Sequence, residues 1–303
     1  MALPRRWQYR VDRYLKAIAS SFHAEPSPPR PRICPGCRTL VGSTATRCPE
    51  CGASLTFSIA AASRAVSALL PGASPATYFI VGLNFLLFAV SLLATVRAAG
   101  QANLLGGIHP QVLQRLGASL PLPYDIAQPW RLVTAIFLHG GLLHIAMNSW
   151  VLMDIGPMVE DVYGSARYLF LYVFTGVTGF ACSSLGAHFS VGASGALTGL
   201  IGVMLAMTMR RGGAQMEMVR SQLIRWIVYI LVFGLIVPGI DNLAHIGGLA
   251  AGFLLGRVVT DQEPATARGR QWSYALGWLA GLAIAASFLF MVLQDSASSA
   301  LRV

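Results

Sequence analysis

One long uncharged stretch constrains the fold of this chain most. Between Tyr168 and Met209, His188 is the only residue among Asp, Glu, Lys, Arg and His. A helix that spans a bilayer needs about 20 apolar residues, so the stretch has room for two spans joined by a tight turn near residues 188–192. Only 11% of the chain is charged and 55% is apolar, whereas soluble domains average about a quarter charged. These values exclude a single soluble domain and a disordered chain, and they favour a membrane protein with several spans.

Apolar segments elsewhere supply the remaining spans. They cover residues 77–96, 142–163, 223–240, 243–259 and 272–293. Because lipid offers no hydrogen-bond partners, each span must satisfy its own backbone as a helix. The sequence therefore predicts an all-α polytopic membrane protein with seven transmembrane helices.

The basic residues predict the orientation of these helices. If the N-terminus is cytoplasmic and the spans alternate, only Arg97, Arg115, Arg131 and Arg302 fall outside. Cytoplasmic segments usually hold the excess of Lys and Arg, so we expect a multi-pass protein with a cytoplasmic N-terminus, in a bacterial inner membrane. The net charge of +10 then reflects loop orientation, and nucleic-acid binding is not favoured.

The first 33 residues form a basic region without the apolar block of a secretory signal peptide. Trp7, Val11 and Leu15 recur at helical spacing, with basic residues between them, and a proline-rich linker follows. Such a helix is typical of one that lies on an anionic membrane surface. It is equally typical of a helix that packs its apolar face on the neighbouring small domain.

Four of the five cysteines lie close together in residues 34–56. Cys34, Cys37, Cys48 and Cys51 form two Cys-x2-Cys pairs separated by ten residues. This spacing is typical of a structural zinc ribbon, in which four thiolates surround one metal ion and leave no open position for catalysis. Two disulfides are the alternative, and a cytoplasmic location disfavours them. The sequence leaves open whether the ribbon binds a soluble partner.

Polar residues mark the starts of the second, fourth and sixth spans. They are His139, His144 and Asn148, then Gly192 to Gly195 with Ser194 between them, then Asn242 and His245. The predicted topology places all three starts in the outer part of the membrane. His144 and Asn148 are four residues apart, so they share one helix face.

Glycines predict that the fourth and sixth helices pack closely. Gly195, Gly199 and Gly202 lie on one, and Gly248, Gly252 and Gly256 lie on the other. Small residues at this spacing let helix backbones approach. Ser194 and His245 would then reach hydrogen-bond distance, and a neutral imidazole can activate a serine hydroxyl. Polar packing between helices is the alternative reading of this pair.

These motifs together resemble the rhomboid family of intramembrane serine proteases. The motifs are Gly-x-Ser-Gly at 192–195, Ala-His-x-x-Gly-x-x-x-Gly at 244–252 with Gly248 and Gly252, and His-x-x-x-Asn at 144–148. Trp130-Arg131 resembles the pair in the first outer loop of that family, and Glu160 with Gly164 resembles the end of its second helix. The motifs occur in the family order on the expected spans.

The resemblance implies a six-helix protease domain over residues 77–260. A linker at 57–76 would precede it, and residues 261–303 would add a linker and a seventh helix. Ser194 would be the nucleophile and His245 the general base and acid, while His144, Asn148 and the backbone N–H of Ser194 would form the oxyanion hole. Catalysis would need no cofactor, and the substrates would be transmembrane proteins cut near the outer face. The alternative is a non-proteolytic rhomboid-like protein that binds membrane clients.

Three residues do not fit simply into this interpretation. Thr198 stands one turn after Ser194, where an aromatic ring is expected to stack on the base; it would loosen His245 or hydrogen-bond it. Asp154 does not share the helix face of His144, so we expect a structural or cavity-facing role. His139 is expected to support the fold or the outer loop.

Overall fold

The computed structural model describes residues 31–34, 37–52, 54–55, 74–99, 107–186 and 189–300. The chain divides into two compact units, residues 1–58 and 59–303, and each is described by itself. The expected basic helix near the N-terminus lies outside the described residues.

The smaller unit contains a two-stranded antiparallel sheet. Strand β1 (Arg32–Ile33) pairs with β2 (Leu40–Val41). The strands flank the first cysteine pair, and the amide of Cys34 donates to the carbonyl of Thr39 at 2.8 Å. The sheet therefore extends the ribbon two residues ahead of Cys34.

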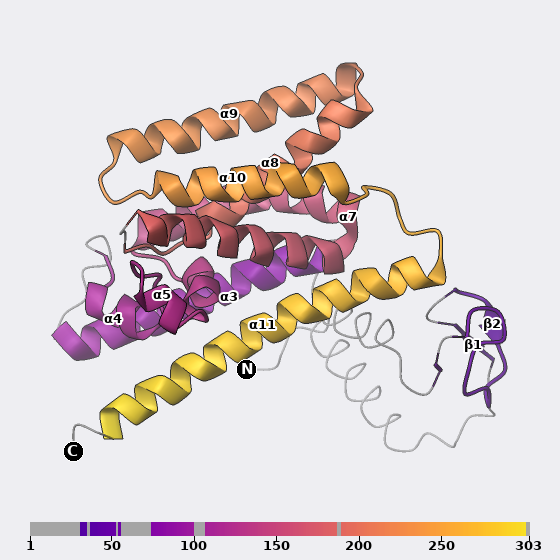
Figure 1. Cartoon of the computed structure of the whole chain (residues 1–303), viewed down its shortest axis with the longest axis horizontal. Coiled ribbons are helices and arrows are strands. Elements are labelled where there is room, and N and C mark those ends of the chain that lie inside the picture. The colour runs from indigo at the N-terminus through magenta and orange to yellow at the C-terminus, as the bar shows by residue number, and fades with distance from the viewer. Residues whose placement is uncertain are drawn as a thin grey trace, which may run out of the picture. The chain divides into compact units, whose positions relative to one another are not determined.

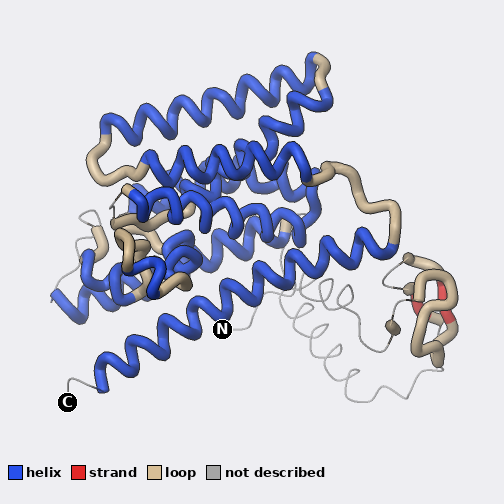
Figure 2. The backbone as a smooth tube through the Cα atoms, in the orientation of Figure 1, coloured by secondary structure: helices blue, strands red, loops and turns tan. Residues whose placement is uncertain are grey.

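Helices make up nearly all of the described part of the larger unit (Figures 1 and 2). The long ones are α3 (Pro75–Ala99), α7 (Leu142–Leu185), α8 (Ser194–Arg211), α9 (Ala214–Ile236), α10 (Asn242–Val258) and α11 (Ala267–Ala300). Between α3 and α7 lie the short α4 (Pro110–Arg115), α5 (Tyr124–Ala127), α6 (Arg131–Thr134) and η1 (Ala135–Phe137).

Four of the described helices, α3, α7, α9 and α11, are long and apolar enough to cross a membrane. Helix α7 has a break at Gly164, where φ is +72°, so its two arms correspond to the second and third expected spans. Helices α8 and α10 are shorter, with 18 and 17 residues. The predicted all-α polytopic membrane fold is confirmed.

Helix α8 lies at the centre of the bundle. Its residues from Gly195 to Met204 are buried, and α7 and α10 pack against it. Helix α9 lies at the edge (Figure 1), where Leu223 is its one fully buried residue among those described. Helix α11 packs on α7 and α6, and the ring of Phe288 lies 6.1 Å from that of Phe137.

Glu160 ties the break in α7 to the start of α3. Its carboxylate accepts hydrogen bonds from the amides of Ala76 and Thr77, both at 2.9 Å, and from the hydroxyl of Ser165 at 2.6 Å. The first amides of a helix lack partners within the helix, so this buried carboxylate caps α3. Glu160 and Gly164 thus fix the break between the two arms of α7.

Candidate active site

Ser194 and His245 form the centre of the candidate site. Ser194 is the first residue of α8 and His245 lies in the first turn of α10. The Oγ atom of Ser194 lies 2.8 Å from Nε2 of His245. His245 is 3% exposed, so its ring is held inside the bundle. This distance suits proton transfer from a hydroxyl to an imidazole.

The glycines of α8 and α10 explain why these side chains meet. A β-carbon on Gly248 would overlap the carbonyl oxygen of Gly195, and one on Gly252 would overlap that of Gly199. Further along, a β-carbon on Gly256 would lie 2.6 Å from the carbonyl oxygen of Val203. The two backbones therefore run in direct contact, as the glycine spacing predicts.

His144 enters the site from the first turn of α7. Its Nδ1 accepts from the amide of Gly140 at 3.3 Å. That bond leaves the ring proton of neutral His144 on Nε2, which is then a donor. A β-carbon on Gly192 would lie 2.7 Å from this Nε2 and 3.6 Å from Nδ2 of Asn148. Both side chains thus point at the backbone two residues before Ser194.

The start of α8 supplies backbone donors at the same place. The first N–H groups of a helix have no intrahelical partner. Gly192, with φ of +129°, turns the chain into this helix, and its amide donates to the carbonyl of Ala135 at 2.9 Å. The backbone at Ser194 is therefore fixed by the segment that precedes α7.

The Trp130-Arg131 pair organises the loop between α3 and α7. The guanidinium of Arg131 lies 4.7 Å from the ring centre of Trp130. It donates to the carbonyls of Gln114 at 2.7 Å and Ala118 at 3.1 Å. Its contacts therefore stabilise the loop and involve neither Ser194 nor His245.

That loop is joined to the segment that leads into α8. Ser119 and Ser190 exchange two backbone hydrogen bonds of 3.0 and 3.1 Å. Asp125 accepts from the hydroxyl of Ser119 at 2.7 Å and from the amide of Leu120 at 2.9 Å. Burial raises the pKa of Asp125, although both donors act in the opposite direction. The loop and the segment that leads into α8 are thus joined by hydrogen bonds.

The three residues that fitted poorly have defined contacts. Thr198 donates to the backbone carbonyl of His245 at 3.0 Å, so it fixes the helix and not the ring. Asp154 accepts from Gln222 at 3.0 Å and from the indole of Trp226 at 2.8 Å, both on α9. The ring of His139 is fully buried, edge-on to His144, with 5.1 Å between the ring centres.

Asn242 contacts the second ring nitrogen of His245, a contact that the sequence interpretation missed. Its Oδ1 lies 3.1 Å from Nδ1 of His245. The two residues are three apart in a predicted helix, and this spacing already indicates a shared face.

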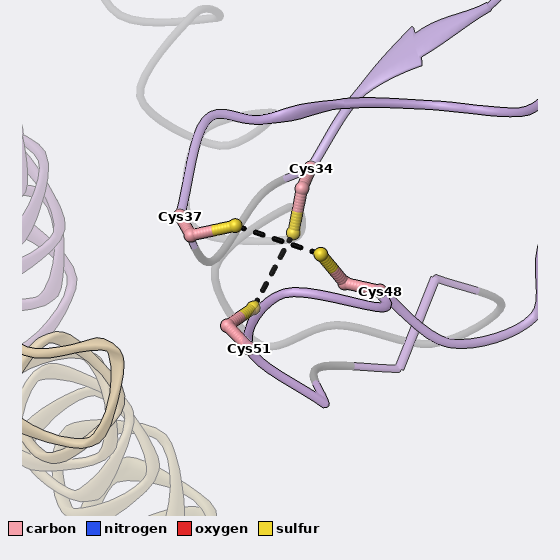
Figure 3. Close-up of side chains that lie close together, drawn as sticks. All are labelled: Cys34, Cys37, Cys48 and Cys51. Atoms are coloured by element: carbon pink, nitrogen blue, oxygen red, sulfur yellow. Dashed lines mark hydrogen bonds between the residues drawn. The ribbon is translucent and has the colours of Figure 1, made fainter.

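The four cysteines of the small unit form a cluster whose geometry fits one metal ion (Figure 3). Their sulfur atoms all lie within 4.8 Å of one another, with 3.7 Å between Cys34 and Cys51 and 3.5 Å between Cys37 and Cys48. A tetrahedron with zinc–sulfur bonds of about 2.3 Å has edges of about 3.8 Å. None of these four cysteines forms a disulfide. Hydrogen bonding with Thr39 lowers the pKa of the Cys37 thiol to about 6, which favours the thiolate that a metal requires.

The helical bundle is that of a polytopic membrane protein. The contact between the Ser194 hydroxyl and the His245 imidazole is a polar site buried inside this bundle. Residues 127–262 match the family model described as Rhomboid domain. Over these residues, which hold Ser194 and His245, the chain therefore carries a rhomboid domain.

Similar proteins carry related names. The chain is 34% identical over 178 residues to Rhomboid protease GluP of Bacillus subtilis, covering 58% of this chain and 33% of that protein. It is 38% identical over 164 residues to RHOMBOID-like protein 5 of Arabidopsis thaliana, covering 52% of each. It is 32% identical over 184 residues to Rhomboid-like protease 2 of Toxoplasma gondii, covering 58% of this chain and 64% of that protein. The chain thus spans between a third and two thirds of the length of these relatives.

Proposed function

We propose that the chain is an intramembrane serine endopeptidase that uses Ser194 and His245. The observation that carries this proposal is the 2.8 Å contact between Ser194 Oγ and His245 Nε2, at the point where α7, α8 and α10 begin. The names of the relatives that are called proteases agree with it. A protein that only binds membrane clients has no need of a hydroxyl paired with an imidazole.

The first half of the reaction forms an acyl-enzyme. His245 Nε2 takes the proton of the Ser194 hydroxyl as Oγ attacks the carbonyl carbon of the scissile peptide bond. The carbonyl oxygen becomes an oxyanion, which accepts from Nε2–H of His144, Nδ2–H of Asn148 and the backbone N–H of Ser194. His245 then gives its proton to the departing amine, and the peptide C–N bond breaks.

The second half releases the other product. Water gives a proton to His245 and attacks the ester carbon, and the same donors hold the second oxyanion. Collapse of this intermediate breaks the bond to Ser194 Oγ, and His245 returns the proton to the serine. Every group in this cycle belongs to the chain, its substrate or water.

The substrate class follows from where the site lies. Ser194 and His245 lie inside a bundle of membrane helices, so the peptide bond must reach them from within the bilayer. We therefore propose that the substrates are transmembrane proteins. They would be cut near the membrane face at which α7, α8 and α10 begin. The basic residues Arg210, Arg211 and Arg257 lie at the other end of α8 and α10. The excess of basic residues at that end supports a cytoplasmic position for it, so we propose that cleavage occurs at the outer face, in a bacterial inner membrane.

Cleavage of a single-span model substrate in proteoliposomes tests the proposal. Ser194→Ala and His245→Ala are expected to reduce product to background, since each removes a partner of the proton transfer. Ser221→Ala is the matched control, because this hydroxyl is exposed on α9 and donates only to the carbonyl of Glu217 in the described structure. Wild-type rates in the Ser194→Ala protein would contradict the assignment.

For the small unit we propose one structural zinc ion held by Cys34, Cys37, Cys48 and Cys51. Four thiolates leave no open coordination position, so the metal would stabilise the fold and take no part in peptide cleavage. A unit this small buries little apolar surface, and metal binding would supply folding free energy.

A further inference from the structure

The second nitrogen of the His245 ring faces an amide side chain. Asn242 is the first residue of α10, and its Oδ1 lies 3.1 Å from His245 Nδ1. The imidazole is therefore held on both sides, by Ser194 at Nε2 and by Asn242 at Nδ1.

A neighbouring helix decides which end of the amide faces the ring. Nδ2 of Asn242 donates to the backbone carbonyl of Leu231 on α9 at 3.2 Å. A carbonyl oxygen only accepts hydrogen bonds, so the opposite orientation would place two acceptors against each other. The hydrogen-bond network thus assigns Oδ1 to the ring.

That orientation determines the tautomer of the neutral imidazole. Oδ1 of Asn242 only accepts, so Nδ1 of His245 must carry the ring proton. Nε2 is then left with a lone pair, which is the state that can accept the proton of Ser194. The other tautomer would place a proton on Nε2 and leave Nδ1 facing an acceptor.

The contact with α9 is close and leaves the amide little freedom. A β-carbon on Gly234 would overlap the side-chain amide of Asn242. Gly234 lies three residues after Leu231, on the same side of α9. The amide is thus enclosed between the backbone of α9 and the imidazole.

The nearby carboxylate of Asp241 has other partners. Its Oδ1 accepts from the amides of Leu243 at 3.0 Å and Ala244 at 3.1 Å, and its Oδ2 accepts from the hydroxyl of Ser183. Asp241 and His144 are titratable groups near His245. Neither hydrogen-bonds Nδ1 in the described structure, so the neutral amide alone orients the ring there.

We propose that Asn242 is a positioning residue that keeps the proton of neutral His245 on Nδ1 and ties the ring to the backbone of α9. The proposal rests on the protease function proposed above. Asn242, which lies on α10 and hydrogen-bonds to α9, would then act together with Ser194 and His245.

Steady-state cleavage at several pH values tests the proposal. Asn242→Leu keeps the branched shape of the side chain but removes both hydrogen bonds, so kcat is expected to fall about 10²-fold, the lower end of what a general base contributes, while KM stays near the wild-type value. Asn242→Asp keeps an acceptor for Nδ1–H and is expected to recover part of kcat. Its carboxylate stabilises the imidazolium, which cannot act as a base, so the acidic limb of its rate profile moves to higher pH.

Gln222→Leu is the matched control for the anchoring of α9. It removes a hydrogen bond between α9 and Asp154 of α7 without touching the imidazole, so its pH profile is expected to stay that of the wild type. Equal profiles for Asn242→Asp and the wild type, or equal losses of kcat for Asn242→Leu and Gln222→Leu, would overturn the proposal.

A spectroscopic measurement gives an answer that needs no activity. In the ¹⁵N-histidine NMR spectrum of the Ser194→Ala protein, assigned with His245→Gln, we expect His245 to be protonated on Nδ1 at neutral pH. A proton on Nε2 would refute the role of Asn242 even if the enzyme is a protease. The Nδ1 proton without any wild-type cleavage would leave the positioning intact and remove only the proposed protease function.

Discussion

The α-carbon of Gly248 lies against the backbone carbonyl of Gly195, with no space for a side chain between α8 and α10. Each residue is close to a residue of the candidate site, since Gly195 follows Ser194 and Gly248 lies one turn after His245. The contact between these two glycines therefore sets the separation of the hydroxyl and the imidazole.

Gly248→Ala is expected to destabilise the bundle and to reduce cleavage. The added β-carbon meets backbone, which cannot turn away, and overpacking of this kind costs about 1–3 kcal/mol. Gly281→Ala on α11 is the control, because a β-carbon there meets nothing within 4 Å. Thermal unfolding in detergent, read together with the cleavage rate, checks the prediction, and equal midpoints for the two variants would contradict it.

Glu160→Ala is expected to lower the thermal midpoint by freeing the start of α3. The change removes the acceptor for the amides of Ala76 and Thr77, and a buried donor without a partner costs about 1–3 kcal/mol. Glu217→Ala, in the first turn of α9, serves as the control with an exposed carboxylate. A midpoint for Glu160→Ala no lower than that of the control would show that the cap contributes nothing.

Asn148→Ala is expected to lower kcat about 10²- to 10³-fold, the usual effect of removing one oxyanion donor. KM should change little, because the donor acts on charge that forms in the transition state. The adjacent Ser149→Ala is a close control, since the Ser149 hydroxyl makes no hydrogen bond within the described residues. An Asn148→Ala enzyme with the kcat of Ser149→Ala would remove Asn148 from the oxyanion hole.

Purified protein is expected to carry about one zinc ion per chain. Replacing Cys34 and Cys48 together by Ser should release it, because each Cys-x2-Cys pair then loses a ligand. Cys182→Ser, which changes the cysteine of α7, should retain the metal. Elemental analysis of the purified proteins measures their zinc content. A metal-free wild-type protein would rule out the zinc site.

The predicted topology places the C-terminus outside the cytoplasm. Alkaline phosphatase fused after residue 303 is expected to be active, because seven spans separate it from a cytoplasmic N-terminus. The same reporter fused after residue 264, before α11, should be inactive. The reverse pattern would invert the orientation and place the site at the cytoplasmic face.

Features that depend on spacing along one chain segment could be predicted from the sequence. The helical spans, the glycine faces of α8 and α10 and the four-cysteine cluster all follow from local patterns. The approach of Ser194 to His245 also follows, because three polar helix starts had to share one depth in the membrane. The ends of helices were less predictable: α9 begins at Ala214 and not near residue 223, since its first turns are polar.

Contacts that depend on the rotation of one helix against another could not be predicted. Thr198 reaches the backbone of His245 instead of its ring, and Asp154 finds its partners on α9. The contact of Asn242 with Leu231 likewise depends on which carbonyl of α9 faces α10. Nothing in the spacing of a single segment specifies these pairings.

The direct contact between the backbones of α8 and α10 also limits how this protein can evolve. Inserting or deleting one residue between Gly195 and Val203, or between Gly248 and Gly256, would turn everything beyond it by about 100°. Bulky side chains would then replace glycine where the helices touch. Relatives are therefore expected to vary in length within their loops and to keep the register of these two segments unchanged.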